Sequence, residues 1–78
     1  MRRIIDGLRY DTEKAKKIGS VPYFFELYKT PNGRFFAFYI SGGEIRPLTV
    51  SEAKRFYEWL SYTSIGYEEA FGEPPEEA

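Results

Sequence analysis

The side chains that could perform catalysis are few in this chain and lack their usual activating partners. Its 78 residues include no His and no Cys, so imidazole acid–base chemistry, thiol nucleophiles and the common zinc ligand sets are missing. Asp6, Asp11 and Glu13 are the carboxylates near the N-terminus, and each fits a turn, a helix cap or a first-turn charge. Five serines have no histidine to activate them. The sequence therefore predicts a protein that is not an enzyme, with no metal ligands and no cofactor.

Binding through aromatic rings is a second kind of chemistry, and PYFFELYKTPNGRFFAFYIS, residues 22–41, favours it. This stretch holds eight of the fifteen aromatic residues. Its second half, RFFAFYIS, resembles the motif that stacks bases in RNA-recognition domains, but Phe35 replaces a Gly and Ser41 replaces an aromatic residue. Eleven basic and twelve acidic residues also leave no net positive charge to attract phosphates. Single-stranded nucleic acid stacked on Phe36 and Phe38 is therefore the alternative ligand, and a protein the preferred one.

The same stretch predicts a β-hairpin. Residues 22–30 and 34–41 are expected to be strands around TPNGR, a sequence suited to a type I turn followed by a left-handed Gly. This turn places Tyr28 opposite Phe36 and Glu26 opposite Phe38. One face of the hairpin then carries the candidate partner-binding residues Phe24, Glu26, Tyr28, Phe36, Phe38 and Ile40.

The two faces of this hairpin are expected to differ in what covers them. The face with Phe25, Leu27 and Ala37 suits a helix, since Ala37 permits close approach. The central Glu26 indicates that its own face is wet, because burying a lone carboxylate is costly. Exposed aromatic side chains around one charge are typical of a protein-binding surface. The alternative is that the N-terminal hairpin or the last helical turn folds over this face and makes a second small core.

Turn and cap signals predict the elements before this hairpin. RRIIDGLRYD indicates a small hairpin over residues 2–10 that turns at Asp6–Gly7, a dipeptide suited to positive φ. DTEKAKKIG then indicates a short helix that begins at Asp11 or Thr12 and ends at Gly19.

The elements after the hairpin are an edge strand and the main helix. Residues 44–46 are expected to form the strand, which Pro47 ends because it donates no ladder hydrogen bond. Thr49 and Glu52 have the spacing of a capping box and predict a helix from there to about Ser61. The apolar stripe of this helix consists of Val50, Ala53, Phe56, Tyr57 and Leu60.

The predicted fold class is α+β: a small antiparallel sheet with one main helix across one face and a short N-terminal helix. YEEAFG adds a last helical turn, which packs Phe71 inward and stops at Gly72. Residues 1–72 are expected to be a single domain, and EPPEEA, residues 73–78, a disordered acidic tail.

Composition also indicates where the protein works. No apolar run reaches the ~20 residues of a membrane span, and MRRIIDGLRY lacks the apolar stretch of a signal peptide. We therefore expect a cytoplasmic protein without a membrane partner. A single Asn, no Gln, no Cys and one Met match the depletion of heat-labile residues in thermophile proteins.

Three segments, RRIIDGLRYDTEKAKKIG, GGEIRPLTVSEAKRFYEWL and YEEAFG, resemble a group of small, largely uncharacterised proteins that phages, prophages and plasmids of bacteria carry. Typical members have a strand, an Asn-Gly or Asp-Gly turn, Lys-Arg-Tyr-Asp-Thr before a helix, a hairpin, Ile-Pro-Leu-Thr before a second helix, and a final Tyr-Glu-Glu-Ile-Phe-Gly. Relatives often have polar, Gly-rich stretches where this chain has its aromatic hairpin. The matching positions are Ile4, Ile5, Gly7, Arg9, Tyr10, Asp11, Thr12, Ala15, Pro47, Leu48, Thr49, Glu52, Ala53, Lys54, Tyr67, Glu68, Glu69, Phe71 and Gly72.

This resemblance implies no catalytic residues. It implies a small protein of a mobile element that works by binding a host or defence-system protein, for example as an inhibitor of a CRISPR effector, in the manner of an anti-CRISPR protein. A homodimer, in which the aromatic patch meets a second copy of itself, is the structural alternative.

Overall fold

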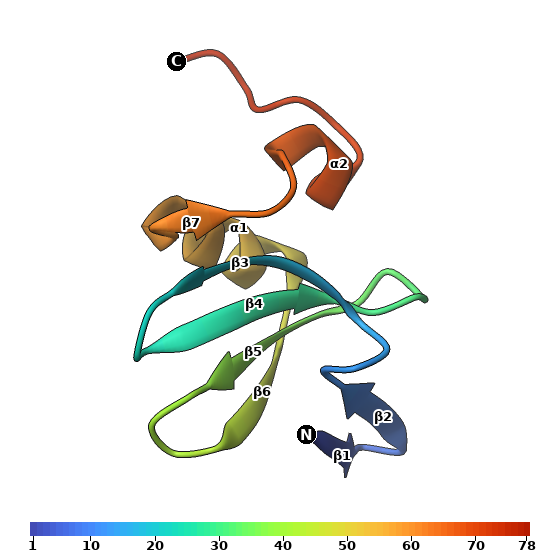
Figure 1. Cartoon of the computed structure of the whole chain (residues 1–78). Coiled ribbons are helices and arrows are strands. Elements are labelled where there is room, and N and C mark those ends of the chain that lie inside the picture. Colours follow the sequence, from blue (N-terminus) through green and yellow to red (C-terminus); the bar gives the residue numbers. More distant parts are fainter.

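Most strands of this protein pair with the strand that follows them in the chain, across a tight turn. The computed structural model describes residues 1–78 and confirms the α+β class: five strands form one antiparallel sheet in the order β6-β5-β4-β3-β7, and β1 and β2 form a separate hairpin (Figure 1). The elements are β1 Arg2–Ile5, β2 Leu8–Asp11, β3 Lys16–Val21, β4 Phe25–Lys29, β5 Phe35–Tyr39, β6 Glu44–Leu48, α1 Val50–Trp59, β7 Tyr62–Thr63 and α2 Tyr67–Phe71.

The central hairpin has the predicted turn and register. Tyr28 pairs with Phe36 and Glu26 with Phe38 across β4 and β5. Gly33 takes a positive φ of 82°, and its N–H donates to the Thr30 carbonyl at 2.9 Å. The strands are shorter than predicted, because residues 22–24 leave the sheet to form the turn between β3 and β4.

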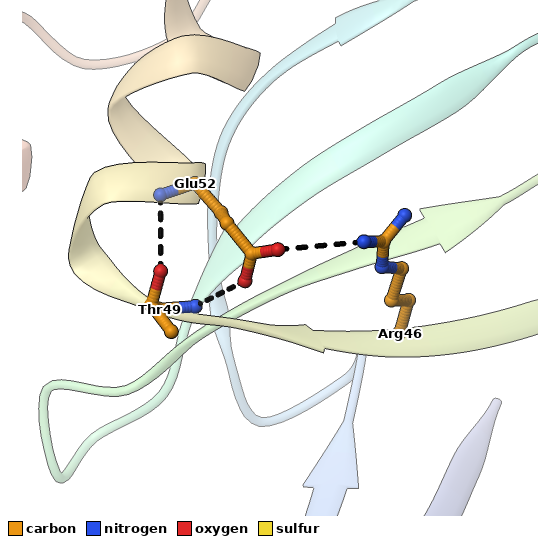
Figure 2. A network of polar contacts seen from close by, with 3 residues as sticks. All are labelled: Arg46, Thr49 and Glu52. Carbon is orange, nitrogen blue, oxygen red and sulfur yellow. Dashed lines mark hydrogen bonds and ion pairs between the residues drawn. The ribbon is translucent and has the colours of Figure 1, made fainter.

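The main helix begins at the predicted capping box. The Glu52 N–H donates to the Thr49 hydroxyl at 3.1 Å, and the Thr49 N–H donates to the Glu52 carboxylate at 2.9 Å. The Arg46 guanidinium, from β6, lies 3.4 Å from the same carboxylate, and Figure 2 shows the three residues together. The helix ends at Trp59, before the predicted Ser61, because Leu60 is already extended.

The helix covers the face of the sheet that was predicted to receive it. Phe25, Leu27 and Ala37 are buried beneath Ala53 and Phe56 in the larger of two cores. The prediction that Val50 belongs to the apolar stripe against the sheet is wrong, since Val50 is 53% exposed. It lies at the first turn of α1.

The predicted short N-terminal helix is wrong, because residues 16–21 form the strand β3. The Asp11 carboxylate accepts from the Glu13 N–H at 2.9 Å, and the Asp11 carbonyl accepts from the Ala15 N–H. Asp11, which was predicted to cap a helix, therefore stabilises a single turn. Pairing with two neighbouring strands and the complete burial of Ile18 then favour the extended chain.

The ends of the sheet differ from the prediction in two ways. β6 continues through Pro47 to Leu48, because an edge strand has no second neighbour that needs the missing N–H. The two-residue strand β7, which was not predicted, pairs with β3 at the other edge. The last turn is confirmed as α2, which stops at Gly72 in the left-handed conformation.

The face opposite the main helix carries a second, smaller core. The N-terminal hairpin has the predicted turn at Asp6 and Gly7, both with positive φ. Its Tyr10 packs with Tyr28, Phe36 and Ile45, and all four are buried. The N-terminal hairpin therefore lies across part of the sheet face that was expected to be free. On that part, the alternative prediction of a second small core is confirmed. None of the helices in the structure has the length and apolar character that crossing a membrane requires.

Candidate protein-binding surface

The six predicted partner-binding residues differ in position and exposure: four lie in β4 and β5, and Phe24 and Ile40 lie in the turns beside these strands. Phe36 is completely buried and Tyr28 nearly so, whereas Glu26 and Phe38 are half-buried. Phe24 and Ile40 are exposed at the end of the sheet. They lie side by side, because the Ile40 N–H donates to the Phe24 carbonyl at 3.0 Å.

Phe36 and Tyr28 are held in the second core by ring contacts. Their rings stack with centroids 5.1 Å apart, and Tyr10 meets Phe36 edge-on at 5.5 Å. A base would have to displace the N-terminal hairpin to reach the Phe36 ring. The expectation that Phe36 offers a free face for stacking is therefore wrong.

Glu26 was expected to keep its face wet, but its charge is compensated by neighbours. The Tyr28 hydroxyl donates to the carboxylate at 2.8 Å, and the Lys17 ammonium lies 3.1 Å from it. Burial acts to raise the pKa of the Glu26 carboxyl, but the hydrogen bonds from Tyr28 and Lys17 outweigh it and lower the pKa. Burial and the contact with Glu26 raise the pKa of the Tyr28 hydroxyl. The hydrogen bond with Tyr28 connects Glu26 to the second core, to which Tyr28 belongs.

The turn between β3 and β4 presents two aromatic side chains to solvent. Tyr23 is 84% exposed and Phe24 is 66% exposed. The Phe24 N–H donates to the Val21 carbonyl at 3.0 Å, and Tyr23 has a φ of +71°. With Pro22 before it, Tyr23 occupies the position that a type II turn normally gives to Gly or Asn. A bulky residue in this conformation is strained, and such strain concentrates at functional sites.

Two more exposed rings lie at the same end of the sheet. Phe56 contacts both Phe25 and Tyr39, which pair with each other next to the β3–β4 turn and the β5–β6 turn. Trp59, about one helical turn further along α1, packs on Phe56 with ring centroids 5.3 Å apart. The end of α1 and the turn between β3 and β4 both lie at the left of Figure 1. Tyr62, in β7, pairs with Ser20 near the end of β3.

We call this surface the aromatic end. It contains five of the eight exposed large hydrophobic residues of the chain, namely Tyr23, Phe24, Ile40, Trp59 and Tyr62.

The aromatic end has an acidic rim. The residues of the aromatic end lie within segments 21–25, 38–45 and 57–63. These segments contain Glu44 and Glu58 but no Lys and no Arg. Both carboxylates belong to exposed residues, and neither makes an ion pair. The formal charges of these segments are therefore all negative.

The sequence prediction missed Tyr23, Trp59 and Tyr62. The signal for Tyr23 was Pro22, which favours the second position of a turn and weakens a central strand. Trp59 and Tyr62 carried no local signal, because their place beside the turn depends on how α1 and β7 pack against the sheet.

The structure contains no group of three or more His, Cys, Asp or Glu residues that would hold a metal ion. In comparisons with family models, curated proteins and solved structures, nothing matches this chain.

Proposed function

We propose that this chain is a non-enzymatic protein-binding module whose aromatic end docks into an apolar recess on another protein. The observation that carries the proposal is the turn that exposes Tyr23 and Phe24. Gly at position 23 would relieve the backbone strain, and polar residues would suit the exposure better. An aromatic pair retained at such a cost is consistent with binding, since aromatic side chains dominate the energetics of protein interfaces.

The charges around the aromatic end favour a partner with Lys or Arg around its recess. Glu44 and Glu58 supply the only formal charges of the three segments, so a basic rim on the partner would complement them. Edge-to-edge strand pairing is a poor alternative at β6, because Pro47 and the exposed charges of Glu44 and Arg46 protect that edge. The partner therefore meets the end of the sheet.

The resemblance to proteins of mobile elements supports inhibition of a bacterial defence complex as the biological role. CRISPR effectors hold their guide–target duplex in a positively charged channel. An acidic rim around an aromatic anchor complements such a channel wall. The role rests on this analogy, while the protein-binding activity rests on the exposed rings and their charges.

A binding experiment with matched variants tests the proposed function. The tagged chain captures its partner from cells that contain the defence complex, and the purified partner is then titrated by calorimetry. The double variant Tyr23→Ser/Phe24→Ser is expected to bind at least about 30-fold more weakly, because two hot-spot rings are lost. The control is Val50→Ser, an exposed apolar residue at the other end of the sheet, which is expected to change the affinity by less than about 2-fold.

Equal affinity of the double variant and the wild type would overturn the proposal. Tight, salt-sensitive binding of a single-stranded oligonucleotide, measured by fluorescence anisotropy at ~0.15 M salt, would favour the nucleic-acid alternative instead. A concentration-dependent dimer that the double variant abolishes would show that the partner is a second copy.

A further inference from the structure

The N-terminal hairpin carries three exposed arginines, of which Arg2 and Arg9 lie on the face opposite Tyr10, away from the sheet, and Arg3 pairs with Tyr10. Arg2, Arg3, Arg9 and the exposed Ile4 line a shallow concavity of about 410 Å³. Ile4 pairs directly with Arg9 across the hairpin, and Arg2 lies two residues before Ile4 on the same face. Arg2 and Arg9 are therefore diagonal neighbours, which places them about 7–8 Å apart with Ile4 beside both.

These three arginines have no partner within the molecule. All four ion pairs of the structure and all its side-chain hydrogen bonds involve other residues. Two acidic residues belong to the hairpin. Asp6 forms the turn, and Asp11, which pairs with Arg2 across the hairpin, is buried, accepts from the Glu13 N–H and makes no ion pair with Arg2. A guanidinium group has a planar set of donors that suits a carboxylate. The chemistry of the concavity therefore suits acidic side chains around a small apolar contact.

The C-terminal segment of the chain has the complementary pattern. Residues 73–78 read EPPEEA, with two prolines between Glu73 and Glu76. Consecutive prolines favour an extended helix of about 3.1 Å per residue, so these two carboxylates are separated by about 9 Å. This spacing matches the diagonal pair of arginines, and the prolines would lie over Ile4. Glu76 and Glu77 make no ion pair, and Glu73 makes one exposed pair with Lys54 at 3.2 Å.

Within one molecule the two complementary segments are kept apart by the sheet. Pro75 and Glu76 lie beside Tyr57 and Leu60, on the side of α1. The N-terminal hairpin packs on the opposite face, through Tyr10. Figure 1 shows the N-terminal hairpin and the C-terminal segment at opposite ends of the view. The arginines of one molecule can therefore be reached by the acidic segment of another.

We propose that the arginine face of the N-terminal hairpin binds the acidic segment 73–78 of a second copy of this chain. The contact is head-to-tail, since it joins two different surfaces, and it leaves one free site at each end of the pair. Exposed ion pairs are individually weak and are screened by salt. The association is therefore reversible, and it strengthens at low ionic strength.

Titration of the labelled full chain with a synthetic Glu-Pro-Pro-Glu-Glu-Ala peptide, followed by NMR, tests the contact. Shifts are expected at residues 2–9, with an affinity that falls at least about 10-fold between ~0.02 M and ~0.3 M salt. Arg2→Ser/Arg9→Ser is expected to lower the affinity at least about 10-fold. The control Arg55→Ser removes an exposed arginine of α1 and is expected to leave the affinity within about 2-fold.

Sedimentation of the full chain over a concentration range supplies a second measurement. The triple variant Glu73→Gln/Glu76→Gln/Glu77→Gln is expected to remain monomeric where the wild type associates. A wild type that stays monomeric at low salt would overturn the proposal. Tighter binding of inorganic phosphate or an oligonucleotide than of the peptide at the same arginines would also overturn it, and would make the hairpin a phosphate site.

Discussion

Phe24, in the turn before β4, is 66% exposed, whereas Phe36, in β5, is completely buried. The difference lies in what covers each ring. The N-terminal hairpin places Tyr10 on Phe36 and stops short of the turn that carries Phe24. The density of rings in residues 22–41 therefore serves two purposes, a core over most of the sheet and an exposed surface at one end.

Phe36→Ala is expected to lower the free energy of unfolding by about 3–5 kcal/mol, because truncation leaves a cavity in the second core. Phe24→Ala is the matched control, since Phe24 is exposed, and it is expected to cost less than about 1.5 kcal/mol. Urea denaturation of both variants measures these values. A Phe36 variant as stable as the Phe24 variant would mean that the N-terminal hairpin does not cover the sheet.

Tyr23→Gly is expected to raise the free energy of unfolding by about 1 kcal/mol, because Gly adopts a positive φ without a steric cost. Tyr23→Ala keeps the Cβ atom and is expected to give no such gain. Thermal and urea denaturation compare the two variants. If both were equally stable, the left-handed backbone at this turn would not be strained.

Glu26 is expected to give the stability of the protein an acid-dependent component. Its folded-state pKa lies below the ordinary value of 4.5, so its contribution is present above about pH 4.5 and is lost as the pH falls through the folded value. Glu26→Gln should therefore be less stable than the wild type at pH 7, with a difference that shrinks as the pH falls below the ordinary value of 4.5.

Urea denaturation at several pH values measures this difference. Lys17→Ala, which removes one of the two donors to Glu26, is expected to show a smaller change in the same direction. A difference between Glu26→Gln and the wild type that is constant with pH would contradict the assignment.

At the scale of the elements, β3 shows how neighbours decide between helix and strand. Lys16 and Lys17 would suit the end of a helix, and Gly19 its stop. In the sheet, the same residues pair with β4, and Gly19 pairs with β7 as well. Gly19 is required by close packing, since a Cβ atom there would clash with the Tyr62 carbonyl oxygen.

Gly19→Ala is expected to destabilise the fold by about 1–3 kcal/mol, because β7 must move away from β3. Gly42→Ala is the control, since a Cβ atom there meets nothing within 4 Å. That substitution is expected to change the free energy of unfolding by less than about 1 kcal/mol. Denaturation of both variants tests the contact, and equal stability would show that β7 is not held at this edge.

At the scale of the whole molecule, two cores share one sheet but are unequal. The larger core joins α1 and α2 to one face, and the smaller core joins only the N-terminal hairpin to the other. No strand of this hairpin is hydrogen-bonded to the five-stranded sheet. Elements with few buried contacts open first.

Amide exchange is expected to show this inequality. The amides of β1 and β2 should exchange at least about 10-fold faster than those of β4 and β5, because the hairpin can open while the sheet stays folded. Tyr10→Ala should accelerate exchange in the hairpin further. Equal protection of both regions would mean that the two cores unfold as one unit.

The sequence by itself determined the features that neighbouring residues control. The turns at Asp6–Gly7 and at Gly33, the capping box of Thr49 and Glu52 and the stop at Gly72 were all predicted, because each depends on backbone conformations within a few residues. The register of β4 and β5 followed from the Gly33 turn, and the alternation of side chains identified the face beneath α1.

Tertiary structure alone decided which apolar faces are covered. Tyr10 contacts Phe36 across many intervening residues, Trp59 packs on Phe56, and Tyr62 pairs with Ser20 near the end of β3. Lys16 to Val21 is a strand because two other strands flank it. Burial depends on contacts between distant segments. A local pattern therefore identifies the apolar side chains but does not indicate which of them become buried.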